Sequence, residues 1–508
     1  MKATPNETLR RSRLLPSPQG SLVRLLALAV AVAVLASIPV RADDQAELIQ
    51  KLLQRIDQLE KKVESLDGGK TNPAGIAPAS DKPAVQALDQ KIRVLERKNE
   101  LEAEGAAAKA RNAPRLSVGS GGFALSSADT NFVLKLRGVV QLDTRTFFKD
   151  NANLTGNDGF LLRRARPIIE GTVYRDFDFQ FVPDFGGSTV QIFDAWLNYR
   201  YRPELQVKVG KFKSPIGLEQ LQADANLSFN ERSLVTDLVP NRDLGVQLWG
   251  DVAGGLVSYA AGVFNGVGDA RNTSNADFDD KKAIEGRLFF QPFKKFDLPA
   301  LQGFGLGLGA SYSQVGSNAN GLPNGGGFVT DGQQQFFAYT NGVVANGEHW
   351  RISPQASYYY GPFGLLGEYA ISNQRVSRGR FADRLQNTAW EISGQWVLTG
   401  EDASFNGVAP LHPFDPGAGQ WGAWQMVGRY ARLDVDRDAF PLFANPNASA
   451  NSATAWSVGV NWWLNRNIRI LTSFSHTTFD GGGTGTTTPG LVTRQPENVL
   501  FTRAQLSF

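Results

Sequence analysis

The feature that most constrains the fold is an alternation of apolar and polar residues that runs from Asn131 to the C-terminal Phe508. In one segment, Phe132, Leu134 and Leu136 alternate with Val133, Lys135 and Arg137, and many later segments of similar length repeat such an alternation. A period of two places the apolar side chains on one face of a strand. Repeats of about ten residues, separated by short turns and by longer Gly/Asn-rich loops, are typical of a transmembrane β-barrel.

The repeats predict an all-β fold, a 16-stranded antiparallel transmembrane β-barrel over residues 130–508. The expected strand centres lie near residues 138, 168, 181, 196, 208, 248, 260, 287, 309, 355, 368, 393, 427, 459, 471 and 503. An even number of strands brings both barrel ends to the periplasmic side. A soluble β-sandwich is the alternative for such alternation. The last strand favours the barrel, because it ends in Phe508, which resembles the signal read by the barrel assembly machinery of the outer membrane.

The N-terminus predicts export. Several arginines precede an apolar run from Leu25 to Ile38, and Val40-Arg41-Ala42 provides a small-x-small cleavage site. We therefore expect residues 1–42 to be a signal peptide. A membrane anchor is the alternative, but the run of about 14 residues is shorter than the roughly 20 that a spanning helix needs.

Residues 43–112 carry a different period. Apolar residues recur at spacings of three and four, first at Ile49, Leu52, Ile56, Leu59, Val63 and Leu66, and again at Val85, Leu88, Ile92 and Leu95. This heptad pattern, broken by a Gly/Pro-rich linker, predicts a short α-helical coiled coil in the periplasm that joins subunits. A solvated amphipathic helix is the alternative. Residues 113–129 are expected to be a tether to the barrel.

One connection in the barrel is unusually long. About thirty residues, 213–243, separate two expected strands, and they contain regularly spaced apolar residues such as Leu221, Leu234 and Leu238. Connections longer than roughly 12–15 residues are uncommon and are usually functional or disordered. Because these apolar residues need a surface to pack against, we expect the loop to fold into the barrel and narrow a pore.

If the apolar positions face lipid, the opposite positions face the water-filled lumen, where basic residues outnumber acidic ones. The first two strands hold a cluster of arginines: Arg137, Arg145, Arg163, Arg164 and Arg166. Several guanidinium groups at one height form a ring that fits phosphate or carboxylate. The alternative is that these arginines pair with wall carboxylates, namely Asp143, Glu170 and Asp194.

The composition gives no sign of enzyme chemistry or of nucleic-acid binding. Lys and Arg total 52 against 49 Asp and Glu, there is no cysteine, and only three histidines occur. His476, the one histidine on an expected strand, falls on the lipid-facing side, so no nucleophile with an adjacent base is predicted. We therefore expect no catalytic residue, metal or cofactor.

Several segments resemble the phosphate-selective porin O and P family: KLRGVVQLD, FLLRRARP with EGTVYRDFDFQF, VGKFKSPIGLE, NERSLVTD, NRDLGVQL, YYYGPFGLLGEY and FTRAQLSF. The resemblance implies a homotrimer of sixteen-stranded barrels in the outer membrane of a Gram-negative bacterium, with a third loop bent into the lumen and diffusion of small inorganic anions. It further implies pore-lining roles for Arg163, Arg164, Asp194, Lys208, Lys211 and Arg232.

The chain departs from that family at two places. The expected fifth loop, GSNANGLPNGGGFVTDGQQQ, has no lysine or arginine, and Val139 stands where the family has an arginine. Both departures weaken the expectation of phosphate specificity. The resulting hypotheses are a porin for small anions, including phosphate or polyphosphate, and a general or organic-solute porin on the same fold. An envelope-tethering protein that works through its coiled coil is a third.

Overall fold

The computed structural model describes residues 82–148, 156–187, 189–273, 277, 279–318, 326–483 and 493–508. The expected signal peptide and the first set of heptads lie outside these residues. The chain divides into two compact units, Met1–Glu100 and Leu101–Phe508, and each is described by itself.

The second set of heptads lies on a helix, α3 (Lys82–Asn112). The segment is rich in Ala, Leu, Glu, Lys and Arg, which are good helix formers, and Arg93 pairs with Asp89 one turn away at 3.0 Å. Ile92, Leu95 and Leu101 on this helix are about half exposed. The helix is thus observed, and its pairing into a coiled coil stays a prediction. No helix within the described ranges combines the length and the apolarity needed to cross a bilayer.

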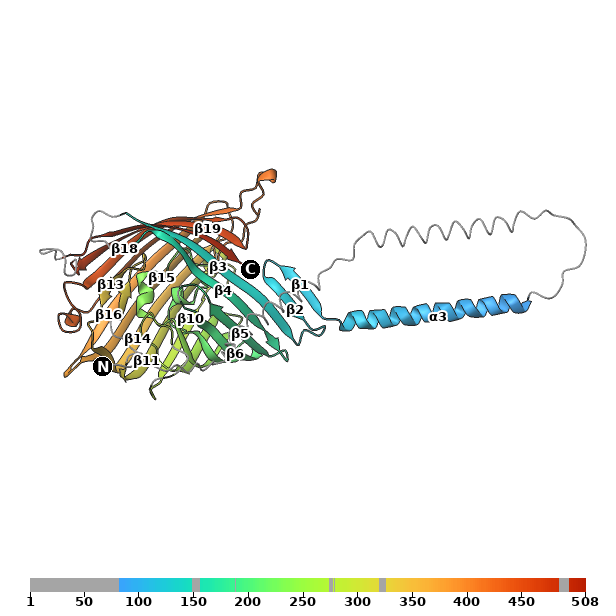
Figure 1. Ribbon diagram of the computed structural model, residues 1–508, viewed down its shortest axis with the longest axis horizontal. Helices are drawn as coiled ribbons and strands as arrows, with labels where there is room; N and C mark the ends of the chain where they lie inside the picture. The colour runs from blue at the N-terminus through green and yellow to red at the C-terminus, as the bar shows by residue number, and fades with distance from the viewer. Residues whose placement is uncertain are drawn as a thin grey trace, which may run out of the picture. The chain divides into compact units, whose positions relative to one another are not determined.

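Sixteen antiparallel strands close into a barrel (Figure 1). In chain order they are β3 (Val133–Phe147), β4 (Gly159–Val173), β5 (Phe177–Asp184), β6 (Gln191–Arg202), β7 (Leu205–Lys213), β8 (Arg242–Val252), β9 (Val257–Phe264), β10 (Ala283–Phe290), β11 (Phe304–Asn318), β14 (Val343–Tyr360), β15 (Phe363–Arg378), β16 (Phe381–Val397), β17 (Ala423–Asp434), β18 (Ala450–Trp463), β19 (Ile468–Gly481) and β20 (Glu497–Ser507). Each strand pairs with its neighbours along the chain, and β20 pairs with β3 to close the ring. Every expected strand centre falls within one of these strands, so the predicted barrel is confirmed.

We call the end of the barrel at which β3 begins and β20 ends the terminus end, and the opposite end the loop end. Several connections contain short helices, among them α4 (Leu218–Leu221) between β7 and β8, α5 (Pro299–Gln302) between β10 and β11, and η2 (Pro416–Ala418) between β16 and β17. The third loop-end connection, residues 214–241, lies between β7 and β8 and is called L3 below.

The segment expected to be a tether, residues 113–129, forms a hairpin instead. Its strands are β1 (Arg115–Gly119) and β2 (Gly122–Ser126), and β2 pairs with the first residues of β3, with Phe123 opposite Leu136. The turn uses Gly122 at φ +94°, a conformation that favours glycine. Leu116 and Val118 in β1, and Phe123 and Leu125 in β2, alternate with other residues at a period of two. This strand pattern, which precedes the predicted barrel, explains why the segment forms a hairpin where a tether was expected.

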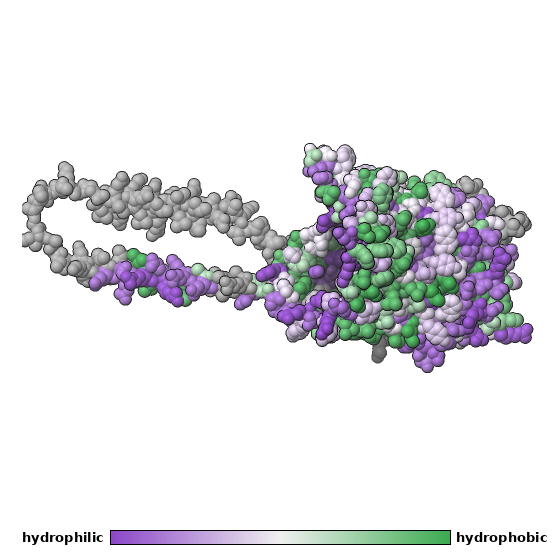
Figure 2. Space-filling model, turned by 180° about the vertical axis from the view of Figure 1, so that it is seen from behind, coloured by the Kyte–Doolittle hydropathy of each residue, from purple (hydrophilic) through white to green (hydrophobic). Residues whose placement is uncertain are grey.

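The outward and inward faces follow the sequence alternation. On β3, the outward Leu134 and Leu142 are 47% and 54% exposed, whereas the inward Gln141 and Asp143 are 0% and 1% exposed. On the face shown in Figure 2, hydrophobic residues gather over the middle of the barrel and hydrophilic ones gather toward its ends. Aromatic pairs stand on the outside at the terminus end, such as Trp424 and Trp462, whose stacked rings lie 5.1 Å apart. This distribution suits a wall in contact with lipid.

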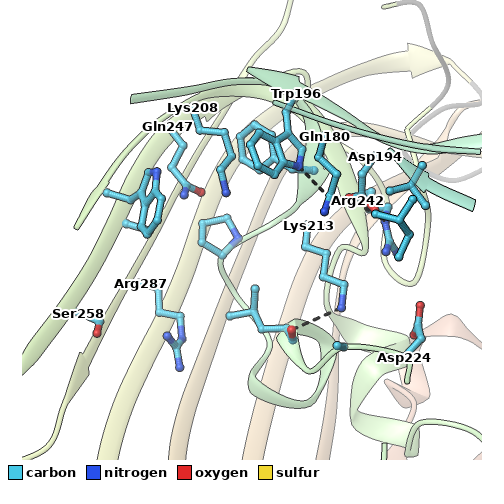
Figure 3. Close-up of a pocket in the computed structure, with 18 of the residues that line it drawn as sticks. Gln180, Asp194, Trp196, Lys208, Lys213, Asp224, Arg242, Gln247, Ser258 and Arg287 are labelled. Carbon is cyan, nitrogen blue, oxygen red and sulfur yellow. Dashed lines mark hydrogen bonds and ion pairs between the residues drawn. The ribbon is translucent and has the colours of Figure 1, made fainter. Parts of the chain in front are cut away.

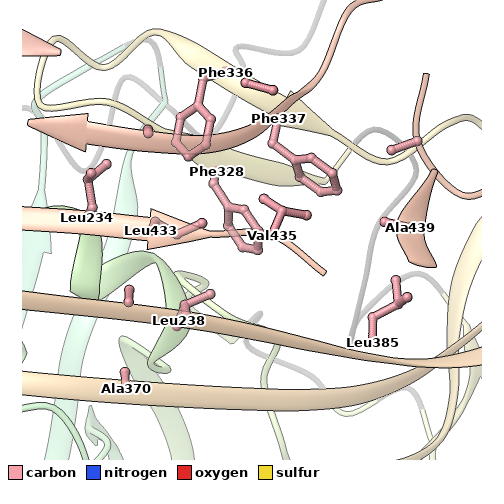
Figure 4. Close-up of a cluster of buried hydrophobic side chains, with 14 of the residues drawn as sticks. Leu234, Leu238, Phe328, Phe336, Phe337, Ala370, Leu385, Leu433, Val435 and Ala439 are labelled. Atoms are coloured by element: carbon pink, nitrogen blue, oxygen red, sulfur yellow. The ribbon is translucent and has the colours of Figure 1, made fainter. Parts of the chain in front are cut away.

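Part of the lumen is filled by an apolar cluster at the loop end (Figure 4). Three elements meet there: η1 (Leu234–Leu238) of L3, the hairpin of β12 (Gly327–Val329) and β13 (Gln335–Ala338), and η3 (Arg437–Ala439) after β17. Strands β15 to β18 face this cluster with small side chains, among them Ala370, Ala389, Ala431, Ala453 and Ala455. Small inward residues leave room for the loops, so this half of the lumen is a packed core.

Replacing Phe337 with alanine is expected to destabilise the barrel. Phe337 is 0% exposed and packs against Phe328 and Tyr339, with ring centroids 5.2 Å and 4.9 Å apart. A buried Phe→Ala change costs about 3–5 kcal/mol in free energy of unfolding. Urea unfolding in detergent micelles measures the change, with the lipid-facing Phe290→Ala as control. Equal midpoints for the two variants would show that the cluster does not stabilise the fold.

Candidate functional site

L3 lies inside the lumen because inward-facing side chains of the wall hold its backbone. Four amides or guanidinium groups donate to L3 carbonyls: Gln141 to Asp224 (3.1 Å), Gln505 to Ala225 (2.9 Å), Arg469 to Leu227 (3.0 Å) and Asn461 to Ser228 (2.9 Å). The apolar side chains of L3 are buried as well, with Leu227, Leu234 and Leu238 at 1% exposure or less. The loop expected at 213–243 therefore narrows the lumen from residue 214 to residue 241.

A β-bulge sets the direction of the paired arginines on β4. In the pairing of β3 with β4, Gln141 lies opposite Arg164 whereas Leu142 lies opposite Leu162, so Arg163 is the extra residue. A bulge of this kind re-aims the side chains of the bulged strand. As a result, both Arg163 and Arg164 face the same carboxylate of L3, that of Glu231.

Glu231 is the first of two acidic centres of L3 that the arginines of β4 contact. Four arginines surround its buried carboxylate, at N···O distances of 2.6 Å for Arg163, 3.4 Å for Arg503, 3.5 Å for Arg145 and 3.9 Å for Arg164. Arg503, on β20, also pairs with Asp143 on β3 at 2.6 Å, across the seam of the barrel. Glu231 thereby binds L3 to β3 and β4 on one side of the β3–β20 seam and to β20 on the other.

Asp224 is the second acidic centre. It pairs with Arg166, with Arg164 at 3.6 Å and with Arg232 at 2.5 Å. Arg232 also donates to the carbonyls of Glu219 and Gln222, so it belongs to the internal structure of L3. Arg166 in turn pairs with Asp184 of β5 at 2.6 Å.

These contacts join into one network with an excess of positive charge. Among the described residues it contains six arginines (Arg145, Arg163, Arg164, Arg166, Arg232 and Arg503) and four carboxylates (Asp143, Asp184, Asp224 and Glu231), which leaves two positive charges uncompensated. The Nε atoms of Arg145 and Arg164 and Nη1 of Arg503 are buried without an acceptor in the described part of the chain. The arginines of β4 thus pair mainly with L3. Of the wall carboxylates named as partners in the sequence, Glu170 does pair with one of the five arginines, Arg137, whereas Asp143 pairs with Arg503 and Asp194 with Arg242.

A separate ion pair completes the narrow region. Arg242, the first residue of β8, pairs with Asp194 of β6 at 3.2 Å. The ring of Phe193 contacts both Arg242 and Arg166, with the guanidinium carbons 4.5 Å and 3.9 Å from its centroid. Such cation–π contacts hold both cations in place over the ring.

Two cavities lie on either side of this region. The loop-end cavity, about 250 Å³, has a lining that includes Arg163, Arg164 and Arg232. The terminus-end cavity, about 500 Å³, has a lining that includes Arg137, Lys208 and Arg287 (Figure 3). Three charged residues line both cavities: Arg166, Asp224 and Arg242. They therefore mark the constriction between the two cavities.

Positive charge prevails in both linings. The loop-end cavity has five arginines against three carboxylates, and the terminus-end cavity has six lysines or arginines against three. One of the loop-end carboxyls, Asp237, is buried and accepts a hydrogen bond from the Val329 amide (2.9 Å). Burial raises the pKa of Asp237 well above its ordinary value, so this group adds little negative charge at neutral pH.

The remaining predicted site residues have separate positions. Arg137 pairs with Glu170 at 3.3 Å near the terminus end. Lys208 lies among aromatic rings of the terminus-end cavity. Lys211 is buried and donates to the Thr273 carbonyl at 2.8 Å. The structure therefore brings Arg145, Arg163, Arg164, Arg166 and Arg232 into one network, and it leaves Arg137, Asp194, Lys208 and Lys211 outside it.

The network is expected to withstand acid. Burial opposes ionisation of Glu231, but the surrounding guanidinium groups outweigh it and lower the pKa of this carboxyl well below its usual range; the same balance lowers the pKa of Asp224. Since both folded pKa values lie below the unfolded ones, near 4, the stabilisation is complete above about pH 5 and is lost only as the pH falls through the lower folded values. We predict that the difference in mean conductance between wild type and Glu231→Gln, which isolates this carboxyl, is the same at pH 7 and at pH 4.5 in planar bilayers. A transition centred near pH 5 would contradict this.

The sequence did not lead us to predict a lumen role for Arg242 or for the aromatic residues that line the terminus-end cavity. Arg242 follows the long loop directly, and its position at the start of a strand was the available signal. Trp196 and Trp249 share the inward parity of Asp194 and Asp251. Alternation alone could therefore have placed both indoles in the lumen.

A Ser–His–Asp group occurs in the wall, but its geometry is not that of a catalytic triad. His349 is on β14 and 1% exposed, so His476 is not the only histidine on a strand. Nε2 of His349 lies 3.0 Å from Ser372 Oγ and 3.4 Å from Asp269 Oδ1. A triad needs the acid and the nucleophile on different ring nitrogens. Here both partners meet the same nitrogen, and Ser372 donates directly to Asp269 (2.5 Å).

A closed barrel whose lumen is narrowed by an inward loop defines a channel of the porin type. Comparison of the sequence with known families agrees with this, because the pattern described as phosphate-selective porin O and P matches residues 134–508. The chain belongs to the phosphate-selective porin O and P family, and its barrel is an outer-membrane channel. No curated protein sequence matches the chain closely enough to add to this.

Solved structures with a similar shape are distant in sequence. DcaP, an outer membrane channel of Acinetobacter baumannii, is 11% identical with a TM-score of 0.48, covering 74% of this chain and 98% of its own. OmpF of Salmonella typhi, in complex with daunomycin, is 12% identical with a TM-score of 0.46, covering 78% and 100%. The trimer form of OmpT from Vibrio cholerae is 11% identical with a TM-score of 0.44, covering 74% and 99%.

Proposed function

We propose that the protein is a passive channel that prefers small anions. The observation that carries the proposal is the excess of two positive charges in the ion-pair network beside the constriction. Arginine and lysine replace part of the hydration that an anion loses in a narrow pore. The basic linings of the two cavities extend the same preference on both sides.

Phosphate passes as one of several small anions in this proposal. A dedicated phosphate site needs several free donors at one height. Here Arg163 and Arg164 are engaged with Glu231, and Val139 contributes an apolar side chain to the terminus-end cavity. The hairpin β12–β13 brings buried phenylalanines into the lumen, where an arginine-bearing loop would bring donors.

A general porin is the competing function, and the extensive ion pairing favours it. If the carboxylates of L3 neutralise the arginines fully, solutes are selected by size alone. Single-channel conductance distinguishes the anion-preferring channel from the general porin when either chloride or potassium is replaced by a bulky ion of the same charge. We expect conductance to fall strongly when chloride is replaced by gluconate and weakly when potassium is replaced by Tris. Equal falls would support the general porin.

Phosphate handling is tested in the same bilayers. We expect phosphate to carry current, with no block of the chloride current at submillimolar phosphate. Saturating block at micromolar phosphate would contradict the proposal, because it would reveal a dedicated site.

We further propose that the channel is a homotrimer with a periplasmic N-terminus. The exposed apolar seam of α3 supports contact with other helices. Phe508 supports recognition by the barrel assembly machinery, since it lies at the closing seam, where its amide and carbonyl both pair with Gly138. Deletion of residues 43–112 should leave single-channel conductance intact. Loss of conductance in that variant would assign the N-terminal segment a role in the pore.

A further inference from the structure

The terminus-end cavity differs in chemistry from the loop-end cavity. Its wall is rich in aromatic and aliphatic side chains, among them Trp196, Phe212, Trp249, Ile168 and Val182. Figure 3 shows Lys208 and Arg287 pointing into this space from the barrel wall. A volume of about 500 Å³ falls in the range of sites for small organic molecules. The cavity can therefore hold more than a hydrated inorganic ion.

Lys208 occupies an aromatic box. Its Nζ lies 4.7 Å from the ring centroid of Trp196, 4.9 Å from that of Trp249 and 5.4 Å from that of Phe212. Both indole N–H groups are committed, that of Trp196 to Gln180 (3.2 Å) and that of Trp249 to Asn198 (2.8 Å). These bonds fix the rings around the ammonium group.

Lys208 forms no ion pair among the described residues, and the nearest acidic residue of the same lining, Asp194, pairs with Arg242. In the part of the chain that the structure describes, no carboxylate lies within ion-pairing distance of Lys208 or Arg287, and Arg287 donates through Nε to Gln355 (2.9 Å). The nearby Gln247, which lines the same cavity, is 6% exposed and its Oε1 has no donor among the described residues. Within the described ranges, the cavity thus presents two cations that form no ion pair, Lys208 and Arg287, and one such carboxylate, Asp251, which accepts a hydrogen bond from Ser258.

The surroundings of Lys208 select among anions by hydration. An anion that reaches this ammonium group must exchange water for indole and aliphatic surface. Inorganic phosphate needs many donors to replace its water and finds few here. A carboxylate attached to an apolar body gains binding free energy instead, because the carbons of that body are buried against the indole rings.

We propose that the terminus-end cavity is a subsite for organic carboxylates with an aromatic or cyclic apolar body. The carboxylate lies at Lys208, and the body lies against Trp196 and Trp249. The proposal rests on the anion preference proposed above and adds a substrate class to it.

The full-length protein in planar bilayers provides the test, through block of the chloride current by benzoate and by acetate. Burial of the ring should lower the half-blocking concentration of benzoate at least about tenfold below that of acetate. Cyclohexylammonium, which has a similar body and the opposite charge, should not block. Equal block by benzoate and acetate, or block by cyclohexylammonium, would overturn the proposal without any variant.

Two variants locate the subsite. Trp249→Leu should reduce the ratio of the acetate to the benzoate half-blocking concentration to about threefold or less, and Lys208→Met should abolish benzoate block. Trp421→Leu, on the exposed outer surface (58% exposed), is the matched control and should behave as wild type. An unchanged ratio in folded Trp249→Leu, with chloride selectivity retained, would place binding elsewhere. If instead the proposed anion preference is wrong, the wild-type channel itself will show no selectivity for chloride over potassium.

Discussion

Replacing Glu231 with glutamine is expected to loosen L3 and to raise both the conductance and the anion selectivity of the channel. Four arginines surround this one carboxylate, and Arg163 pairs with no other acidic group among the described residues. Removing one partner of a buried ion pair costs on the order of 3–5 kcal/mol, because the other charge is left buried and uncompensated. The positive excess in the network rises from two charges to three.

Two readouts check this result. Thermal unfolding in detergent micelles should show a lower midpoint for Glu231→Gln than for Glu204→Gln, which removes an exposed carboxylate in a turn at the terminus end. Single-channel records should show a larger and noisier conductance, since the loop is held to β4 and β20 by fewer contacts. Wild-type stability together with wild-type conductance would mean that Glu231 does not anchor the loop.

Neutralising Arg166 and Arg242 together is expected to abolish anion preference. Both residues line both cavities, so a passing ion meets them at the constriction. Arg166→Gln leaves five arginines against four carboxylates in the network, and Arg242→Gln leaves Asp194 as an unpaired negative charge. The sum of these two changes removes the positive excess of two. The channel should then discriminate weakly between chloride and potassium.

The matched control for this pair is Arg200→Gln. Arg200 is also a lumen-side arginine and pairs with Asp178 at 3.1 Å, but its side chain is 43% exposed and it lines neither cavity. Ion selectivity of the control should equal that of wild type. If the control lost selectivity as strongly as the double variant, the lumen as a whole would set selectivity and the constriction would have no special role.

The barrel was predictable because its signal is local and repeated. A period of two identifies a strand from neighbouring residues alone, and sixteen such segments placed all sixteen strands. The same parity separated Leu134 and Leu142 on the outside from Gln141 and Asp143 on the inside. The hairpin at Arg115–Ser126 carries the same signal in shorter form, which made it easy to read as part of a tether.

The ion-pair partners of the arginines were not predictable. They depend on the position of each side chain along the barrel axis and on the β-bulge in β4. Arg163 and Glu231 are separated by 68 residues in sequence, and parity does not tell which level of the lumen a loop reaches. The bulge at Arg163 changes the facing of one residue, which alternation cannot show. The apolar cluster at Phe337 has the same origin, since it joins three loops that lie far apart along the chain.

The reversal potential of the wild-type channel under a tenfold KCl gradient tests the central claim most directly. With two uncompensated positive charges beside the constriction, chloride should carry most of the current, and the reversal potential should lie close to the chloride equilibrium potential. The Arg166→Gln/Arg242→Gln variant should move it toward zero. A wild-type reversal potential at zero, or on the potassium side, would contradict the account.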